Sequence, residues 1–239
     1  MVKIVIDKGN SATKFGVFDK GTLLAVNYAP HDDQSPLLST MRHYQPQAAI
    51  VSSVLTDEDY TEIKKLVPKF VLLNSDTPLP FTNLYATPQT LGKDRLAAVA
   101  GAQSLYPDSS ILIIDAGTAV TYEILLNGKT YIGGNIAPGL EMRFKALNTF
   151  TSKLPMVSKL EKHDFPGLST NEAIASGVIN GMVFEMEGYR STCLEKWGIN
   201  NTIITGGDSD FFAIKLKNPI FANQNLVLLG LNRILEYNA

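Results

Sequence analysis

Two short acidic turns are the residues of this chain best suited to hold a cation beside a phosphate. Asp7 and Gly9 come directly after one apolar run, and Asp115 and Gly117 come directly after another. Carboxylates hold Mg²⁺ or a monovalent cation, and glycine lets backbone amides approach the anion. One Asp-x-Gly alone is ordinary turn chemistry. Because the pair recurs at an offset of 108 residues, we expect a cleft that receives one carboxylate from each side.

Two further segments could contribute to such a site. Asp94 and Arg95 open an apolar, alanine-rich stretch predicted to be a helix, where a carboxylate and a guanidinium could orient an acid substrate and accept a hydroxyl proton. The alternative is a first-turn acid beside a surface base. Gly206 and Gly207 follow a predicted strand and could let a flat ring or a phosphate lie against the backbone. A tight strand-to-helix turn has the same composition.

Familiar nucleotide and metal motifs are missing from the sequence. It contains no G-x-x-x-x-G-K-[ST] and no G-x-G-x-x-G placed between a strand and a helix, so a nucleotide would have to bind in another way. The three histidines, at positions 31, 43 and 163, have no ligand-like spacing and are expected to be exposed. Cys193 is expected to pack within a helix rather than to act as a nucleophile.

The elements that must position these residues form two similar series. Each series begins with three extended segments, and each continues with helices and a further strand, which predicts an α/β fold of mixed sheets under helices. The predicted strands are 2–6, 13–18, 22–28, 48–54, 70–73, 111–114, 120–126, 130–136 and 202–205. The predicted helices are 57–66 with Thr56 as N-cap, 91–105, 139–150, 171–196 with Thr170 as N-cap, and 226–237.

Composition narrows the class of protein. The 239 residues carry a formal net charge of −2, which gives no field to recruit nucleic acid or an anionic membrane. A single cysteine excludes an internal disulfide, the N-terminus does not read as a signal peptide, and no apolar run approaches the roughly 18 residues of a membrane span. We therefore expect a cytoplasmic protein with no nucleic-acid and no membrane partner.

Taken together, the motifs resemble the type III pantothenate kinases of the acetate and sugar kinase, Hsp70 and actin superfamily, collinearly over nearly the whole chain. Residues 7–14 resemble the first phosphate motif and 115–121 the second. Residues 85–95 resemble the pantothenate motif, and 205–208 the adenosine-side motif. The segments G-G-x-I-x-P-G at 133–139, T-x-K-L-P at 151–155 and the stretch 169–177 match as well. Ser11 stands where many members have threonine, which keeps a hydroxyl.

The resemblance implies two ribonuclease H-like (actin-like ATPase) halves, residues 1–108 and 109–239, with a cleft between them. It implies ATP-dependent phosphorylation of pantothenate to 4'-phosphopantothenate, the first step of coenzyme A biosynthesis, in a homodimer that requires Mg²⁺ and K⁺ or ammonium. Asp94 would be the proton acceptor, Asp115 would ligate the monovalent cation, and Asp7 would hold Mg²⁺ through the phosphates. The implied ATP contacts are Asp7, Lys8, Gly9, Asn10, Ser11, Ala12, Thr13, Lys14, Thr118, Gly206 and Gly207. The implied pantothenate contacts are Tyr85, Gly92, Lys93, Asp94, Arg95 and Thr170.

Two other functions fit parts of the pattern. A non-catalytic accessory or regulatory protein could keep the nucleotide-binding shell as a switch, which degenerate motifs would favour. A related kinase acting on a sugar or another hydroxy acid would fit the duplicated fold but not the segment 85–95. Assaying ATP consumption with different acceptors separates all three functions.

Overall fold

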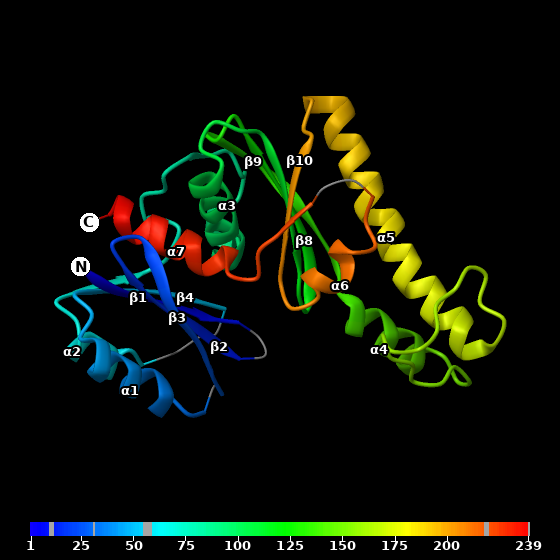
Figure 1. Ribbon diagram of the computed structural model, residues 1–239, viewed down its shortest axis with the longest axis horizontal. Helices are drawn as coiled ribbons and strands as arrows, with labels where there is room; N and C mark the ends of the chain where they lie inside the picture. The colour runs from blue at the N-terminus through cyan, green and yellow to red at the C-terminus, as the bar shows by residue number, and fades with distance from the viewer. Residues whose placement is uncertain (10–11, 31, 55–58, 218–219, 239) are drawn as a thin grey trace. The chain divides into compact units, whose positions relative to one another are not determined.

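The protein is described here by a computed structural model, which covers residues 1–9, 12–30, 32–54, 59–217 and 220–238. These residues fold into two compact units, with elements labelled as in Figure 1. The first unit comprises Met1–Ser109, Leu125–Gly133 and Asn225–Ala239, and the second comprises Ser110–Ile124 and Gly134–Gln224. The last segment of the chain therefore belongs to the same unit as the first. The predicted division into halves 1–108 and 109–239 concerns the two similar series of elements in the sequence, and it stays a prediction.

A five-stranded sheet forms the centre of the first unit, in the order β3-β2-β1-β4-β5. β1 is antiparallel to β2 and parallel to β4. Its apolar residues Ile4, Val5 and Ile6 are almost fully buried, as expected for β-branched residues on a strand covered on both faces. The strands are β1 (Val2–Lys8), β2 (Thr13–Asp19), β3 (Thr22–Ala29), β4 (Ala48–Ser53) and β5 (Lys69–Leu72).

Two helices of the first unit pack with almost no gap between their backbones. A Cβ added to Gly101 of α3 would lie 2.2 Å from the carbonyl oxygen of Leu226, and one added to Gly230 of α7 would lie 1.7 Å from that of Ala97. Only glycine allows this contact, so these two positions fix how the final helix packs. The helices are α1 (Ser35–Tyr44), α2 (Thr61–Lys65), the 3₁₀ turn η1 (Pro88–Thr90), α3 (Lys93–Leu105) and α7 (Leu226–Tyr237).

The second sheet has the order β11-β10-β7-β8-β9-β6. β10 is parallel to β7 and to β11, just as β4 is parallel to β1 and to β5. The series β3-β2-β1-β4-β5 is thus repeated as β9-β8-β7-β10-β11, which confirms the predicted duplication. The strands are β6 (Thr82–Asn83), β7 (Ile111–Ala116), β8 (Ala119–Leu126), β9 (Thr130–Pro138), β10 (Asn201–Thr205) and β11 (Phe221–Ala222).

Three helices belong to the second unit: α4 (Leu140–Phe150), α5 (Thr170–Trp197) and α6 (Ser209–Ala213). The N-cap of α5 is Ser169, whose hydroxyl accepts the backbone N–H of Glu172 at 3.3 Å. The prediction that Thr170 caps this helix is therefore wrong by one residue, because Thr170 is already helical. Gly198, in the left-handed region with φ of 65°, ends the helix.

Two other predictions about helices need correction. The sequence pattern predicts no helix between residues 30 and 47, where the structure has α1. This helix has no side-chain N-cap, and Pro36 in its first turn is its main start signal. The predicted helix 57–66 is shorter, since residues 59 and 60 are not helical and α2 begins at Thr61. Thr56 and residues 57–58 lie outside the described residues.

Candidate active site

The first acidic turn connects β1 to β2 in the first unit. Asp7 lies opposite Lys14 in the antiparallel register, and Lys8 lies opposite Thr13. The backbone N–H of Gly9 donates to the carbonyl of Ala12 at 3.2 Å. The strands thus hold a carboxylate and an ammonium group at neighbouring positions beside the turn. Asn10 and Ser11 of the predicted phosphate motif lie outside the described residues.

Asp7 lies in an environment that disfavours its charge. Burial and the nearby negative charge of Asp94 raise the pKa of Asp7 from 3.8 to about 7, and Ser52 and Lys14 oppose the change only in part. Ser52 occupies the matching position on β4. Two carboxyl groups held this close fit a cation between or beside them, because a positive charge relieves both their repulsion and the cost of burial.

The start of α3 places Asp94 close enough to Asp7 to change its pKa. Gly92 is the N-cap, and the Asp94 carboxylate accepts the backbone N–H of Arg95 at 2.8 Å. A Cβ on Gly92 would lie 2.5 Å from the same carboxylate oxygen, so the absence of a side chain at Gly92 allows this oxygen to occupy its position. Lys93 donates to the carbonyl of Leu91 at 3.0 Å, and burial lowers the pKa of its ammonium group.

Two tyrosines contact the guanidinium of Arg95. The guanidinium carbon lies 5.3 Å from the centre of the Tyr85 ring, and Nη2 donates to the hydroxyl of Tyr131 at 3.2 Å. The structure thus brings together Tyr85 and Arg95, as predicted. Tyr131 was not among the predicted site residues. Its place two residues before the conspicuous Gly133-Gly134 pair is the one signal in the sequence that could have drawn attention to it.

The second acidic turn follows β7 in the second unit and faces a glycine. Asp115 pairs with Thr205 of β10, and a Cβ on Gly206, which has a φ of 92°, would lie 2.5 Å from the Asp115 carboxylate and from the Ala116 backbone. The N–H of Asp208 donates to the Ala116 carbonyl at 3.0 Å. Asp115, Gly206 and Gly207 are therefore neighbours, in a cradle that leaves no room for a side chain on Gly206.

Backbone oxygens of the same turn meet the end of β9. The N–H of Gly139 donates to the carbonyl of Thr118 at 3.1 Å, and a Cβ there would lie 2.3 Å from the carbonyl oxygens of Gly117 and Thr118. Carboxylate and backbone carbonyl oxygens are ligands that hard cations take in proteins. The residues around Asp115 therefore fit the predicted cation.

A partly buried ion pair holds the end of β9. Arg143 of α4 donates to the Pro138 carbonyl at 2.8 Å and to Glu185 of α5 at 2.7 Å. Glu185 also accepts the hydroxyl of Tyr122 at 2.7 Å. Burial and this carboxylate raise the pKa of Tyr122. The network fixes the Pro138-Gly139 peptide against the Thr118 turn.

Comparison with known proteins gives the family. A family model described as type III pantothenate kinase matches residues 3–192. A protein of Phocaeicola vulgatus named type III pantothenate kinase is 46% identical over 239 residues, covering 99% of each chain. The chain belongs to the type III pantothenate kinase family.

Solved structures show the fold of this family member. A Campylobacter jejuni protein assigned by its name to the Baf family of transcriptional activators superposes with a TM-score of 0.66 at 23% identity, covering 98% of each chain. A ROK hexokinase of Thermus thermophilus gives 0.56 at 12% identity, covering 100% of this chain and 99% of the other. At these identities the likeness concerns the fold, which is the duplicated actin-like ATPase fold.

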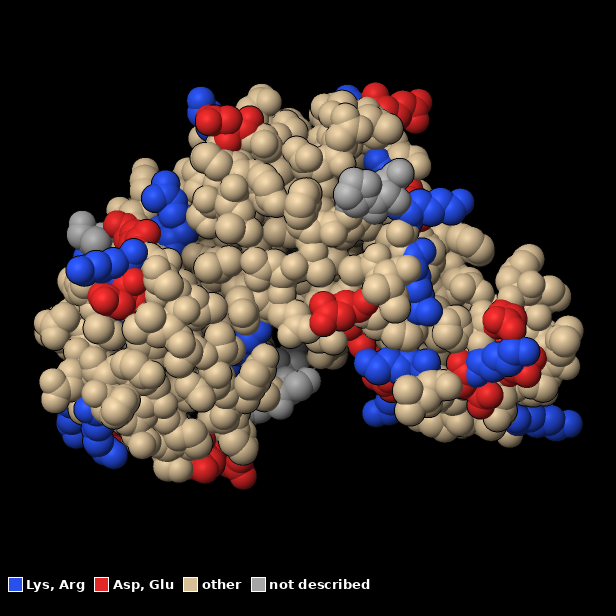
Figure 2. Space-filling view, in the orientation of Figure 1, with Lys and Arg blue, Asp and Glu red and all other residues tan. Residues whose placement is uncertain are grey.

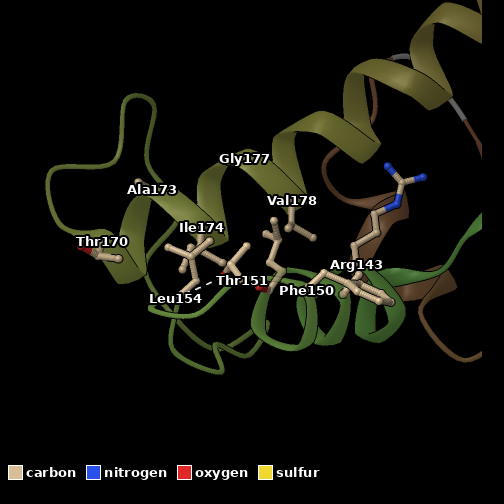
Figure 3. A pocket seen from close by; sticks show the side chains of 11 residues that line it. Arg143, Phe150, Thr151, Leu154, Thr170, Ala173, Ile174, Gly177 and Val178 are labelled. Atoms are coloured by element: carbon tan, nitrogen blue, oxygen red, sulfur yellow. Dashed lines mark hydrogen bonds between the residues drawn. The ribbon is translucent and has the colours of Figure 1, made fainter.

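Thr170, predicted to contact pantothenate, lies in the second unit of this kinase, at one end of an apolar pocket of about 870 Å³. The pocket lies between α4 and α5, with Arg143 at the other end (Figure 3). Its wall is built from Leu147, Phe150, Leu154, Ile174 and Val178 among others. The Phe150 side chain is 85% exposed, so the apolar surface continues out of the pocket.

The face of the kinase drawn in Figure 2 is mixed in charge. On this face, Lys and Arg side chains lie interspersed with Asp and Glu. Within the described ranges, no helix is both long and apolar enough to cross a membrane, and His, Cys, Asp and Glu do not form a metal-binding group of three or more.

The predicted exposure of the histidines is confirmed for His43. His163 is instead half-buried, with its Nε2 atom 2.8 Å from Nζ of Lys215. His31 lies outside the described residues.

Proposed function

We propose that this chain transfers the γ-phosphoryl group of ATP to the primary hydroxyl of pantothenate, giving 4'-phosphopantothenate in the first step of coenzyme A biosynthesis. The observation that carries the proposal is the placement of Asp94 beside Asp7 at the start of α3, with Arg95 next along the helix. The residues proposed as the base, as the site for a metal-bound phosphate and as the cation for an acid substrate all belong to the first unit. The family assignment names the acceptor.

In the proposed reaction, the hydroxyl oxygen of pantothenate bonds to the γ-phosphorus as the bond from that phosphorus to the bridging oxygen of ADP breaks. Asp94 orients the hydroxyl and accepts its proton. The transition state of phosphoryl transfer is loose, so the protein contributes mainly in-line positioning and neutralisation of charge. General-base assistance adds typically ~10²–10⁴-fold.

The phosphates and cations are assigned to the two acidic turns. The first-unit residues proposed to hold ATP are Asp7, Lys8, Gly9, Asn10, Ser11, Ala12, Thr13 and Lys14, and those of the second unit are Thr118, Gly206 and Gly207. Mg²⁺ bound to the ATP phosphates would neutralise their charge. Asp7 would help to hold this phosphate-bound Mg²⁺. Asp115 and neighbouring carbonyls would hold K⁺ or ammonium.

The acceptor is assigned to the residues around the start of α3. Tyr85, Gly92, Lys93, Asp94 and Arg95 of the first unit are proposed to bind pantothenate, with Thr170 of the second unit as a further contact. Arg95 is the proposed partner of the pantothenate carboxylate, because a guanidinium fork matches two carboxylate oxygens. Its near-complete burial, at 5% exposed, strengthens such a pair.

We also propose that the enzyme is a cytoplasmic homodimer. Support comes from the apolar surface of α4 and α5, where the side chains of Met142, Phe150 and Phe184 are 46%, 85% and 65% exposed. Exposed apolar surface of this kind favours association. Sedimentation of wild type and Phe184→Asp tests it, since the variant should shift toward the monomer.

The function is tested by measuring ADP release by the purified chain in K⁺ buffer with Mg²⁺ and ATP. We expect ADP release that depends on pantothenate and yields an equal amount of phosphorylated product. ATP binding without turnover would instead indicate the non-catalytic accessory protein. Turnover with a sugar or another hydroxy acid, but not with pantothenate, would indicate the related kinase.

A further inference from the structure

The buried guanidinium of Arg95 is oriented by two aromatic residues that come from different segments of the first unit. Tyr85 lies over its face at 5.3 Å, and the Tyr131 hydroxyl accepts an N–H from Nη2 at 3.2 Å. An arginine side chain has many rotamers, and a carboxylate is bound in two-pronged fashion only when the plane of the fork is correctly turned. The ring contact and the hydrogen bond both restrict rotation of the fork.

The position of the Tyr131 hydroxyl is itself fixed. Tyr131 is fully buried on β9, where its carbonyl accepts the backbone N–H of Leu84 at 2.9 Å. Its ring stacks with Tyr85, with centres 6.4 Å apart and planes 13° apart, and meets the edge of Phe81 at 6.2 Å. Gly133, with a φ of 114°, lies where a Cβ would be 3.5 Å from the Tyr85 ring. Backbone pairing and ring packing therefore leave the hydroxyl little freedom to move.

We propose that Tyr131 is a positioning residue for acceptor specificity: its hydroxyl holds Arg95 in the orientation that pairs with the carboxylate of the acceptor. The inference rests on the proposed function, and deepens it by naming what makes the enzyme prefer an acid over a neutral alcohol of the same shape. Tyr131 acts through Arg95 and takes no part in the transfer itself. Its loss should therefore weaken recognition of the carboxylate without slowing the chemical step.

The test uses two acceptors that share the reacting hydroxyl. Panthenol carries a primary alcohol where pantothenate carries its carboxylate. Tyr131→Phe removes only the hydroxyl and keeps the ring contacts. We expect KM for pantothenate to rise about tenfold, the loss typical of a hydrogen bond to a charged group, with kcat within about twofold. KM and kcat for panthenol should stay within about twofold of wild type.

Two further variants make the result specific. Tyr122→Phe is the matched control, because it removes the hydroxyl of an equally buried tyrosine in the second unit. It should leave the ratio of kcat/KM for pantothenate to that for panthenol unchanged. Arg95→Gln should lower the same ratio, and adding Tyr131→Phe to it should lower the ratio no further. Tyr131→His, which keeps a ring and a hydrogen-bond acceptor, should restore part of the preference and serves if Tyr131→Phe does not fold.

The outcomes separate the inference from the function on which it rests. A wild-type enzyme that phosphorylates neither acceptor overturns the proposed function. A wild-type enzyme that is active while Tyr131→Phe and Tyr131→His change both acceptors equally, or change neither, overturns only the role of Tyr131. A further loss of the ratio when Tyr131→Phe is added to Arg95→Gln would also overturn it.

Discussion

Asp7 of β1 and Asp115 of β7 occupy equivalent places in the two sheets but have different surroundings. Asp7 pairs with Ser52 on the parallel strand β4, and Asp115 pairs with Thr205 on the parallel strand β10. The acid of the first unit lies near a second carboxyl group, Asp94, and an ammonium group. The acid of the second unit faces Gly206 and the backbone of its own turn.

The difference shows how a duplicated fold can divide labour. The shared strands place one carboxylate at the end of each sheet's central strand. We propose that the surroundings of each carboxylate then set its role. In the first unit, Asp94 of the nearby helix α3 would add a base beside a metal site, and in the second unit the Gly206 turn would complete a cation site. The predictions below test this division.

The largest effect is expected at Asp94. Asp94→Asn keeps the shape and removes the base, so kcat should fall ~10²–10⁴-fold, with the affinity for ATP within about twofold of wild type. Steady-state kinetics and nucleotide titration measure the two quantities. Asp76→Asn, which removes another carboxylate that acts on Lys93, is the control and should keep its turnover. Near-normal turnover in Asp94→Asn would remove Asp94 as the base.

Asp7 should limit stability at alkaline pH. The folded state raises the pKa of Asp7 from 3.8 to about 7, so the folded protein binds this proton more tightly than the unfolded chain does, and stability falls as pH rises between these values. Without nucleotide or metal, Asp7→Asn should be more stable than wild type at pH 8, by at most about 4 kcal/mol, and by less at pH 5.

Urea denaturation at the two pH values measures this difference. Asp19→Asn is the control, because the N-terminal ammonium group lowers the pKa of Asp19, so its removal should not stabilise the protein. A gain for Asp7→Asn that is equal at pH 5 and pH 8 would contradict the assignment. Activity of the Asp7 variant should fall despite its greater stability.

Asp115 should control the response to monovalent cations. Wild-type activity should rise steeply when K⁺ or ammonium replaces Na⁺. In Asp115→Asn, the K⁺ concentration for half-maximal activity should rise about tenfold, equivalent to about 1.4 kcal/mol. Titration of activity with KCl at constant ionic strength measures it, with exposed Asp108→Asn as control. An enzyme indifferent to the cation would contradict the ligand assignment.

The smallest effect is expected at Gly92. The Cβ of Gly92→Ala would lie 2.5 Å from the Asp94 carboxylate, which can move aside because it ends a side chain. We expect kcat to fall about fivefold, because the base is displaced rather than removed, with little change in unfolding temperature. Gly188→Ala on α5, where the added Cβ meets nothing within 4 Å, should keep full activity.

The acidic turns and most of the strands could be predicted from local patterns in the sequence. Asp7 and Asp115 could be matched because apolar runs and turn residues are short-range signals. Helix α1 was missed because its segment is polar and lacks a side-chain cap, although Leu37 and Met41, one helical turn apart, are both buried. The predicted N-cap of α5 was wrong by one residue because Ser169 and Thr170 are both residue types that favour the N-cap position.

The rest of the site depends on contacts that a sequence does not display. The hydrogen bond from Arg95 to Tyr131 joins residues 36 apart in the chain. The raised pKa of Asp7 needs the start of α3 to be nearby, which no local pattern reports. The ion pair of Arg143 and Glu185 and the glycine contact of α3 with α7 likewise arise only from packing.

That glycine contact has a consequence for how the protein is made. Since α7 belongs to the same unit as β1, that unit cannot be complete until residue 237 has been synthesised. The intervening second unit, whose segments all precede α7, can fold first. The unit that contains the N-terminus therefore gains its last helix only after every segment of the second unit has been synthesised.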